Sequence, residues 1–122
     1  MMRTGRLISI VDDDDSLRNS LANLIRSVGF RTQAFASAEA FLGSQQARAT
    51  ACLILDVRMA GMNGLDLQRH LVAADWRIPI IFITSHADDD ARTRALEAGA
   101  VGFLYKPCRE EDLFRALETA LQ

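Results

Sequence analysis

The stretch Leu7-Ile8-Ser9-Ile10-Val11-Asp12-Asp13-Asp14-Asp15 places four consecutive carboxylates directly after a short apolar run. The run over 7–11 is brief, apolar and rich in β-branched residues, which predicts a buried strand. The chain repeats this arrangement at Cys52-Leu53-Ile54-Leu55, which ends at Asp56. Ligands bind at the carboxyl ends of the strands in open α/β sheets, so both acidic positions fall where a site is expected.

Composition and charge limit the classes of protein that this chain could form. Its 122 residues suit one domain, and 49% hydrophobic and 25% charged residues are typical of a globular protein. The net charge of −2, without a basic tract, argues against nucleic-acid binding by this segment. No apolar run approaches the ~18 residues of a membrane span, and residues 1–6 carry no secretion signal, so we expect a cytoplasmic location.

Strand and helix patterns alternate along the whole chain. Apolar runs predict strands over residues 7–11, 31–35, 51–55, 79–84 and 101–105. Apolar spacings of three and four residues predict helices over 17–28, 37–42, 65–72, 91–98 and 110–121, with a loop over 45–49. The alternation predicts an α/β fold with five helices and a doubly wound, five-stranded parallel sheet, flavodoxin-like, in the strand order 2-1-3-4-5.

In that strand order the first and third strands end side by side, so Asp12, Asp13 and Asp56 meet at one edge of the sheet. Carboxylates crowded together need a cation, and Mg²⁺ suits a site with few carboxylates and room for phosphate. We expect direct ligation by Asp13 and Asp56, with Asp12 acting mainly through water. The backbone carbonyl of Arg58 is the remaining ligand that we expect the protein to supply.

The same edge carries groups suited to phosphoryl transfer. Asp56 stands alone at a strand tip, and a carboxylate beside Mg²⁺ can act as a nucleophile toward phosphorus. Lys106 follows the fifth strand and would supply a fixed positive charge, while the Thr84 hydroxyl at the end of the fourth strand can donate to a phosphoryl oxygen. The acyl phosphate product is labile, which predicts a timed switch.

These residues carry a resemblance to the receiver domains of bacterial two-component response regulators, over essentially the whole chain. The matching motifs, in order, are Val11-Asp12-Asp13, Leu55-Asp56-Val57-Arg58-Met59, Asn63-Gly64, Ile83-Thr84, Ala98-Gly99-Ala100 and Lys106-Pro107. Residues 37–42 and 56–59 resemble most closely the nitrogen-fixation regulator (FixJ-like) subfamily, whose members carry a DNA-binding output domain.

The resemblance implies a single receiver domain over 1–122 that accepts phosphate on Asp56 from a sensor histidine kinase. In this view the domain is a regulatory switch in a phosphorelay and not a turnover enzyme, and it controls transcription through an output domain beyond residue 122. Asp12 and Asp13 match the metal-binding pair of the family, and Lys106 matches its phosphate-contacting lysine. The bond between Lys106 and Pro107 is implied to be cis.

The resemblance also implies a route for the signal. Thr84 matches the switch hydroxyl of the family, and Phe103 matches the aromatic residue whose rotamer reports phosphorylation. When Thr84 moves toward the phosphate, Phe103 would turn inward. The face formed by the fourth helix and the fifth strand would then change shape and pair with a second copy of the chain.

Three positions depart from the pattern of the family. Ala60 replaces the usual proline, which predicts a more mobile loop, and Tyr105 stands at an often acidic position. Cys108 replaces a common phenylalanine. The changes at Tyr105 and Cys108 affect the expected dimer face. They leave the residues expected to take part in phosphorylation unchanged. Cys108 and Cys52 lack metal-ligand spacing and are expected to be free thiols.

Other functions remain as alternatives. An aspartate-dependent phosphatase of the haloacid dehalogenase kind would need a second aspartate two residues after the nucleophile, where this chain has Arg58. A flavin-binding module would need a loop rich in hydroxyls and glycine after the first strand. An unphosphorylated interaction module is disfavoured because every residue expected to take part in phosphorylation is present.

Three further polar residues are expected to lie outside the site. Asp14 and Asp15 are expected to serve as a solvated helix cap, and His86 as an exposed loop residue.

Overall fold

Five parallel strands form one sheet in the order β2-β1-β3-β4-β5 in the computed structural model, which describes residues 5–86 and 88–122. The strands are β1 (Leu7–Val11), β2 (Arg31–Phe35), β3 (Thr50–Leu55), β4 (Ile80–Thr84) and β5 (Gly102–Tyr105). The α-helices are α1 (Asp15–Ser27), α2 (Ala38–Leu42), α3 (Gly64–Ala73), α4 (Asp89–Glu97) and α5 (Glu110–Ala120). The predicted fold class, strand order and five helices are confirmed.

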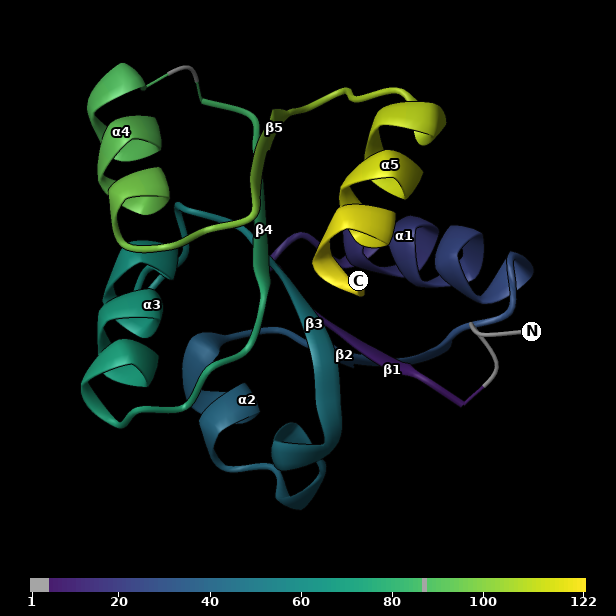
Figure 1. Ribbon diagram of the computed structural model, residues 1–122, viewed down its shortest axis with the longest axis horizontal. Helices are drawn as coiled ribbons and strands as arrows, with labels where there is room; N and C mark the ends of the chain where they lie inside the picture. The colour runs from purple at the N-terminus through teal and green to yellow at the C-terminus, as the bar shows by residue number, and fades with distance from the viewer. Residues whose placement is uncertain (1–4, 87) are drawn as a thin grey trace.

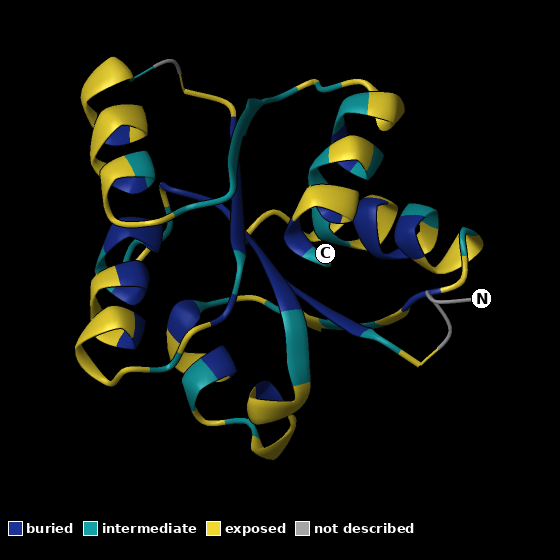
Figure 2. Cartoon of the chain, in the orientation of Figure 1, coloured by how far each residue is buried: buried dark blue, intermediate teal, exposed yellow. Residues whose placement is uncertain are grey.

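The helices cover both faces of the sheet, as Figure 1 shows: α1 and α5 lie on one face, and α2, α3 and α4 lie on the other. The inner surfaces of the helices and the central strands are buried, while the outer helix surfaces are exposed (Figure 2). Every residue of β1 and β4 is buried, which is expected of parallel strands with helices on both faces.

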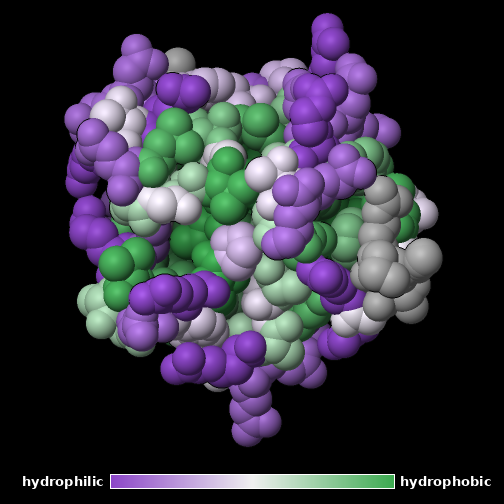
Figure 3. All heavy atoms as spheres, viewed as in Figure 1, coloured by the Kyte–Doolittle hydropathy of each residue, from purple (hydrophilic) through white to green (hydrophobic). Residues whose placement is uncertain are grey.

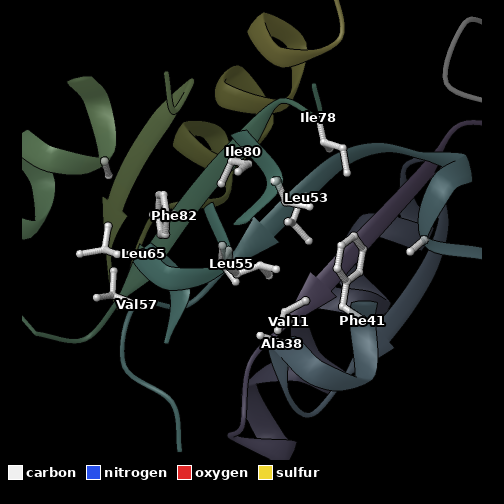
Figure 4. Packing of buried hydrophobic residues seen from close by; sticks show 14 of the residues in the cluster. Val11, Ala38, Phe41, Leu53, Leu55, Val57, Leu65, Ile78, Ile80 and Phe82 are labelled. Atoms are coloured by element: carbon white, nitrogen blue, oxygen red, sulfur yellow. The ribbon is translucent and has the colours of Figure 1, made fainter. Parts of the chain in front are cut away.

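Successive strand residues point to opposite faces, so the sheet divides its apolar side chains between two cores. Val11, Leu53, Leu55 and Phe82 pack with Phe41 of α2 and with α3 and α4 (Figure 4). The core on the other face contains strand residues packed with α1 and α5, namely Ile8, Ile10, Cys52, Ile54, Ile81 and Ile83. The two cores fix both faces of the strands whose carboxyl ends carry the acidic residues.

Polar side chains cap the helices near these strand ends. Asp14 caps α1 by accepting the backbone N–H of Leu17, and Asp88 caps α4 by accepting that of Ala91. Ser37 caps α2 in the same way. The cap role expected for Asp14 is confirmed, while Asp15 is the first residue of the helix and lies in its acidic first turn.

The prediction of a loop over 45–49 is wrong, because Gln45–Ala49 forms a 3₁₀ helix, η1. The side chain of Ser44 accepts the backbone N–H of Gln46 and starts the turn, and Ala47 is buried beneath it. A segment this short is stabilised by its cap and one buried residue rather than by a periodic apolar face. Residues 1–4, part of the segment considered for a secretion signal, lie outside the described residues.

None of the helices in the described ranges 5–86 and 88–122 is long and apolar enough to cross a membrane. Of the two cysteines, Cys52 is buried and Cys108 is partly exposed, and both are free thiols, as predicted.

Candidate functional site

The carboxylates of Asp12, Asp13 and Asp56 come together where β1 and β3 end. Val11 and Leu55 are partners in the parallel register, so the next residue of each strand lies at the same edge. The backbone N–H of Asp56 donates to the carbonyl of Val11 over 3.0 Å and extends the ladder by one bond. One oxygen from each of the three carboxylates lies within 4.8 Å of the others. The structure therefore brings Asp56 beside two acids that precede it by 43 and 44 positions in the sequence.

Two of these acids are buried and the third is exposed. Asp12 and Asp56 retain 2% and 7% of their accessible surface, while Asp13 faces solvent. Burial, together with the charge of Asp12, raises the pKa of Asp56, although Lys106 and the backbone N–H of Arg58 act in the opposite direction. A cation at this edge would add positive charge beside the buried carboxylates of Asp12 and Asp56.

Lys106 lies over the two buried acids. Its ammonium nitrogen is 2.9 Å from Oδ2 of Asp12 and 3.5 Å from Oδ2 of Asp56. Burial disfavours the charged ammonium, but the hydrogen bond to Asp12 and the charges of both acids outweigh it and raise the pKa of Lys106. The backbone N–H of Lys106 donates to the carbonyl of Thr84, and the bond to Pro107 is cis, as the resemblance implied.

Asp12 is held by protein groups on all of its oxygens. Its Oδ1 accepts the backbone N–H of Asp14 over 2.9 Å, and its Oδ2 accepts the ammonium of Lys106. The carbonyl oxygen of Asp12 accepts Nη1 of Arg18 over 2.7 Å. Arg18 was missed at the sequence level, because an arginine on an amphipathic helix gives no sign that it turns back toward the preceding strand.

The backbone of α3 begins directly against the backbone of Asp56. A Cβ atom on Gly64 would lie 2.1 Å from the carbonyl oxygen of Asp56 and 3.0 Å from the ring of Phe82. The N–H of Gly64 donates to the carbonyl of Val57 over 2.9 Å, and Asn63 forms a capping box with Asp66. Asn63-Gly64 was identified from the sequence as one of the matching motifs, and the structure shows that Gly64 is needed for this close approach behind the central acid.

Thr84 and Phe103 lie farther along the sheet. Thr84 ends β4 and is 1% exposed, and its hydroxyl oxygen accepts the backbone N–H of His86 over 3.3 Å. Phe103 is the register partner of Phe82, with ring centroids 5.7 Å apart, and its ring also lies 5.5 Å from that of Tyr105. His86 is exposed, as expected. Thr84 thus shares the edge with the acids, while Phe103 packs against the core on the face covered by α3 and α4.

The loop from Val57 to Asn63 borders the acids on their exposed side. Arg58 turns its side chain outward, with Nη2 4.0 Å from Oδ2 of Asp88 at the start of α4. The N–H of Ala60 donates to Oδ2 of Asp13 over 3.4 Å. Carboxylate oxygens gathered in this way are the ligands that hard divalent cations prefer, so this cluster could bind a metal ion.

Comparison with known proteins identifies similar chains. The family described as "Response regulator receiver domain" matches residues 8–118. The response regulator protein TmoT of Ectopseudomonas mendocina is 50% identical over 116 residues, which cover 95% of this chain and 53% of TmoT. The transcriptional regulatory protein FixJ of Bradyrhizobium diazoefficiens is 36% identical over 121 residues, which cover 99% of this chain and 59% of FixJ.

A solved structure agrees with these matches. The crystal structure of FixJ-N superposes with a TM-score of 0.87 at 37% identity, covering 97% of this chain and 94% of that one. The chain spans about half the length of the curated relatives TmoT and FixJ.

Proposed function

This chain belongs to the response regulator receiver domain family, and on that basis we propose that it is a phosphorylation-activated switch whose phosphoacceptor is Asp56. Receiver domains are phosphorylated by sensor histidine kinases, and the match to FixJ agrees with the predicted subfamily. The observation that carries the assignment of Asp56 is its position at the tip of β3, beside Asp12 and Asp13 and 3.5 Å from the ammonium of Lys106.

The proposed reaction is a single phosphoryl transfer. A carboxylate oxygen of Asp56 attacks the phosphorus of a phosphohistidine on the kinase, an O–P bond forms, and the P–N bond breaks. The imidazole nitrogen leaves with the bonding electron pair. Lys106 holds a fixed ammonium beside the attacked group and stabilises negative charge on the phosphoryl oxygens. Arg58 stands where a phosphatase would need a second acid, so the proposed domain does not turn over external substrates.

The three acids and the backbone carbonyl of Arg58 are the proposed Mg²⁺ ligands. Both carboxylate oxygens of Asp12 are already engaged by Asp14 and Lys106, which supports indirect binding by Asp12 through water. Asp13 is exposed, and Oδ2 of Asp56 is 3.5 Å from the ammonium of Lys106, a longer contact than the 2.9 Å to Asp12, which supports direct binding by these two. When bound, Mg²⁺ supplies positive charge that offsets the crowded carboxylates and the transferred phosphoryl group.

We propose that Thr84 and Phe103 transmit the modification. The Thr84 hydroxyl would give up its hydrogen bond with the N–H of His86 and donate to a phosphoryl oxygen. Phe103 would then turn into the space that the Thr84 side chain vacates.

The surface around β5 is a candidate for self-association. β5 lies between α4 and α5 (Figure 1), and hydrophobic residues gather over the middle of this face (Figure 3). On the α4 side of β5, Phe103 packs against the core that includes α4, and Phe103 and Tyr105, with ring centroids 5.5 Å apart, are only partly buried. This apolar surface supports self-dimerisation through the α4–β5 face after phosphorylation.

We propose that the domain is the receiver half of a longer regulator with a DNA-binding output domain. The relatives are about twice as long as this chain, and FixJ is a transcriptional regulator. In such a protein the receiver itself would not bind nucleic acid, in keeping with its net charge of −2, and transcription would be controlled through the output domain.

Incubation with acetyl phosphate and Mg²⁺, followed by intact-mass measurement, tests the acceptor. We expect one added phosphate, absent from Asp56→Asn and absent with a chelator. Asp14→Asn is the matched control, because Asp14 is an exposed helix cap and asparagine caps equally well. An adduct that persists in Asp56→Asn would overturn the assignment, and rapid multiple turnover would favour the phosphatase instead.

Size-exclusion chromatography with beryllofluoride, which mimics the phosphoryl group on Asp56, tests the dimer. We expect earlier elution with beryllofluoride than without it, and later elution again when Tyr105, which is partly exposed on the α4 side of β5, is replaced by Glu. Unchanged elution of the unmodified chain would contradict dimerisation through this face.

A further inference from the structure

The loop that borders the acids receives support from a helix that the proposed mechanism does not use. Residues 57–63 carry the Arg58 carbonyl and the Ala60 N–H that reaches Asp13. Arg58, Ala60 and Gly61 are exposed, and the family's usual proline is missing at Ala60. Val57, Met59 and Met62 pack against the core, but the exposed residues Ala60 and Gly61 lie between them, so the position of this exposed part depends on the hydrogen bonds that hold it.

One of these bonds comes from Glu39 in the first turn of α2. Its Oε2 accepts the backbone N–H of Met62 over 3.0 Å, across 23 positions of sequence. Met62 directly precedes Asn63, which caps α3. The bond therefore fixes the end of the loop opposite to Asp56, while the Ala60 N–H contacts Asp13 near its middle.

The backbone of the loop is shaped to admit this carboxylate. Gly61 has a φ of +77°, and a Cβ atom there would lie 2.9 Å from Oε2 of Glu39. Glycine is the residue that adopts this φ without strain, and its missing side chain leaves room for the carboxylate. The Met62 N–H also lowers the pKa of Glu39, so the side chain is ionised when it accepts the bond.

The helix that carries Glu39 is itself firmly attached. Ala38 and Phe41, on either side of Glu39 in α2, are fully buried, and the ring of Phe41 stacks on Trp76 at 5.8 Å. Ser37 caps the helix. Glu39 thus extends from a helix fixed to the sheet to the residue that directly follows the exposed part of the loop.

We propose that Glu39 is a positioning residue that braces the loop 57–63 and so holds the Arg58 carbonyl and Asp13 in place for Mg²⁺. This inference rests on the proposed function and assigns a role to the Ser37-Ala38-Glu39-Ala40-Phe41-Leu42 segment, which the phosphorylation chemistry leaves unused. Loss of the brace weakens metal binding first and slows phosphorylation of Asp56 as a consequence.

The test measures Mg²⁺ affinity without any phosphate donor, by titration followed through backbone amide resonances. Glu39→Ala is expected to raise the dissociation constant about fivefold, the factor of a typical net hydrogen bond, and to speed hydrogen exchange of the Met62 amide in metal-free protein. Glu39→Gln keeps an acceptor oxygen at the same reach, so it should restore most of both properties. Glu111→Ala is the control, because Glu111 is exposed and occupies the same second position in α5.

Unchanged Mg²⁺ affinity and Met62 exchange in Glu39→Ala, relative to Glu111→Ala, would overturn the proposal. A general loss of stability is distinguished by thermal unfolding, since a brace on an exposed loop leaves the melting temperature near that of Glu111→Ala. If the unmodified chain binds Mg²⁺ but accepts no phosphate on Asp56, the proposed function fails, whereas the effect of Glu39→Ala on Mg²⁺ affinity still supports the brace.

Discussion

The ammonium nitrogen of Lys106 lies 2.9 Å from Oδ2 of Asp12, although the two residues are 94 positions apart in the sequence. The side chains are 15% and 3% exposed, so this ion pair is largely removed from water. The same nitrogen lies 3.5 Å from Asp56, which makes Lys106 the shared counter-charge of two buried acids.

Lys106→Met should therefore destabilise the metal-free domain. The methionine fills similar space but leaves Asp12 and Asp56 without their counter-charge, and we expect the free energy of unfolding to fall by about 1–3 kcal/mol. Urea denaturation with a chelator measures the loss, and adding Mg²⁺ should recover part of it. Lys106→Arg is the control that keeps the charge. Equal stability of Lys106→Met and the unmodified chain without metal would refute this role.

Asp56→Asn should have the opposite effect at neutral pH. The pKa of Asp56 is raised in the folded state, so folding favours the protonated carboxyl, and stability falls as pH rises from the ordinary aspartate value through the raised one. The neutral amide escapes this cost, and we expect metal-free Asp56→Asn to be more stable at about pH 7 by about 1 kcal/mol. The advantage should vanish below about pH 3.9, the ordinary pKa of aspartate. A less stable variant at neutral pH would contradict the argument.

Gly64→Ala should be poorly tolerated. The new methyl group would lie 2.1 Å from the carbonyl oxygen of Asp56, so the start of α3 or the acid itself must move. We expect a loss of about 2–3 kcal/mol in chemical denaturation. Gly102→Ala is the matched control, since its Cβ would have no heavy atom closer than 3.7 Å and should cost less than about 1 kcal/mol. Equal effects of the two substitutions would show that the close approach does not matter.

The two thiols should differ in reactivity. Cys52 is fully buried and burial raises its pKa to about 12, while Cys108 is partly exposed and burial raises its pKa by less. A colorimetric thiol reagent should modify one thiol in the folded chain and two in urea. Cys108→Ser should abolish the reaction of the folded chain and Cys52→Ala should leave it intact. Rapid modification of both folded thiols would contradict the observed burial.

The sequence was sufficient to predict the strands and the meeting of the acids, for a physical reason. Apolar runs such as Leu7–Val11 are too short for helices and too apolar for surface strands, and parallel order brings their carboxyl ends to one edge. Asp12 and Asp56 are the residues that directly follow two such runs. Their meeting therefore follows from topology alone.

Contacts that depend on side-chain reach could not be predicted in this way. The bonds from Arg18 to the Asp12 carbonyl and from Glu39 to the Met62 amide join an ordinary helix surface residue to a backbone group. No periodicity or spacing marks such a pair. The 3₁₀ turn at Gln45–Ala49 was missed for a related reason, because its cap and its one buried alanine leave no pattern in so short a segment.

The ammonium between the buried acids has a practical consequence, since Lys106 is the only lysine in the sequence. Within these 122 residues, reagents that acylate primary amines can modify only this side chain and a free amino terminus. Coupling through amines to a sensor chip or a dye would therefore use either the amino terminus or the ammonium beside Asp12 and Asp56, and attachment through an engineered surface cysteine is preferable for binding studies. Conversely, the rate at which Lys106 is acylated reports directly whether its ammonium is paired with Asp12 and Asp56.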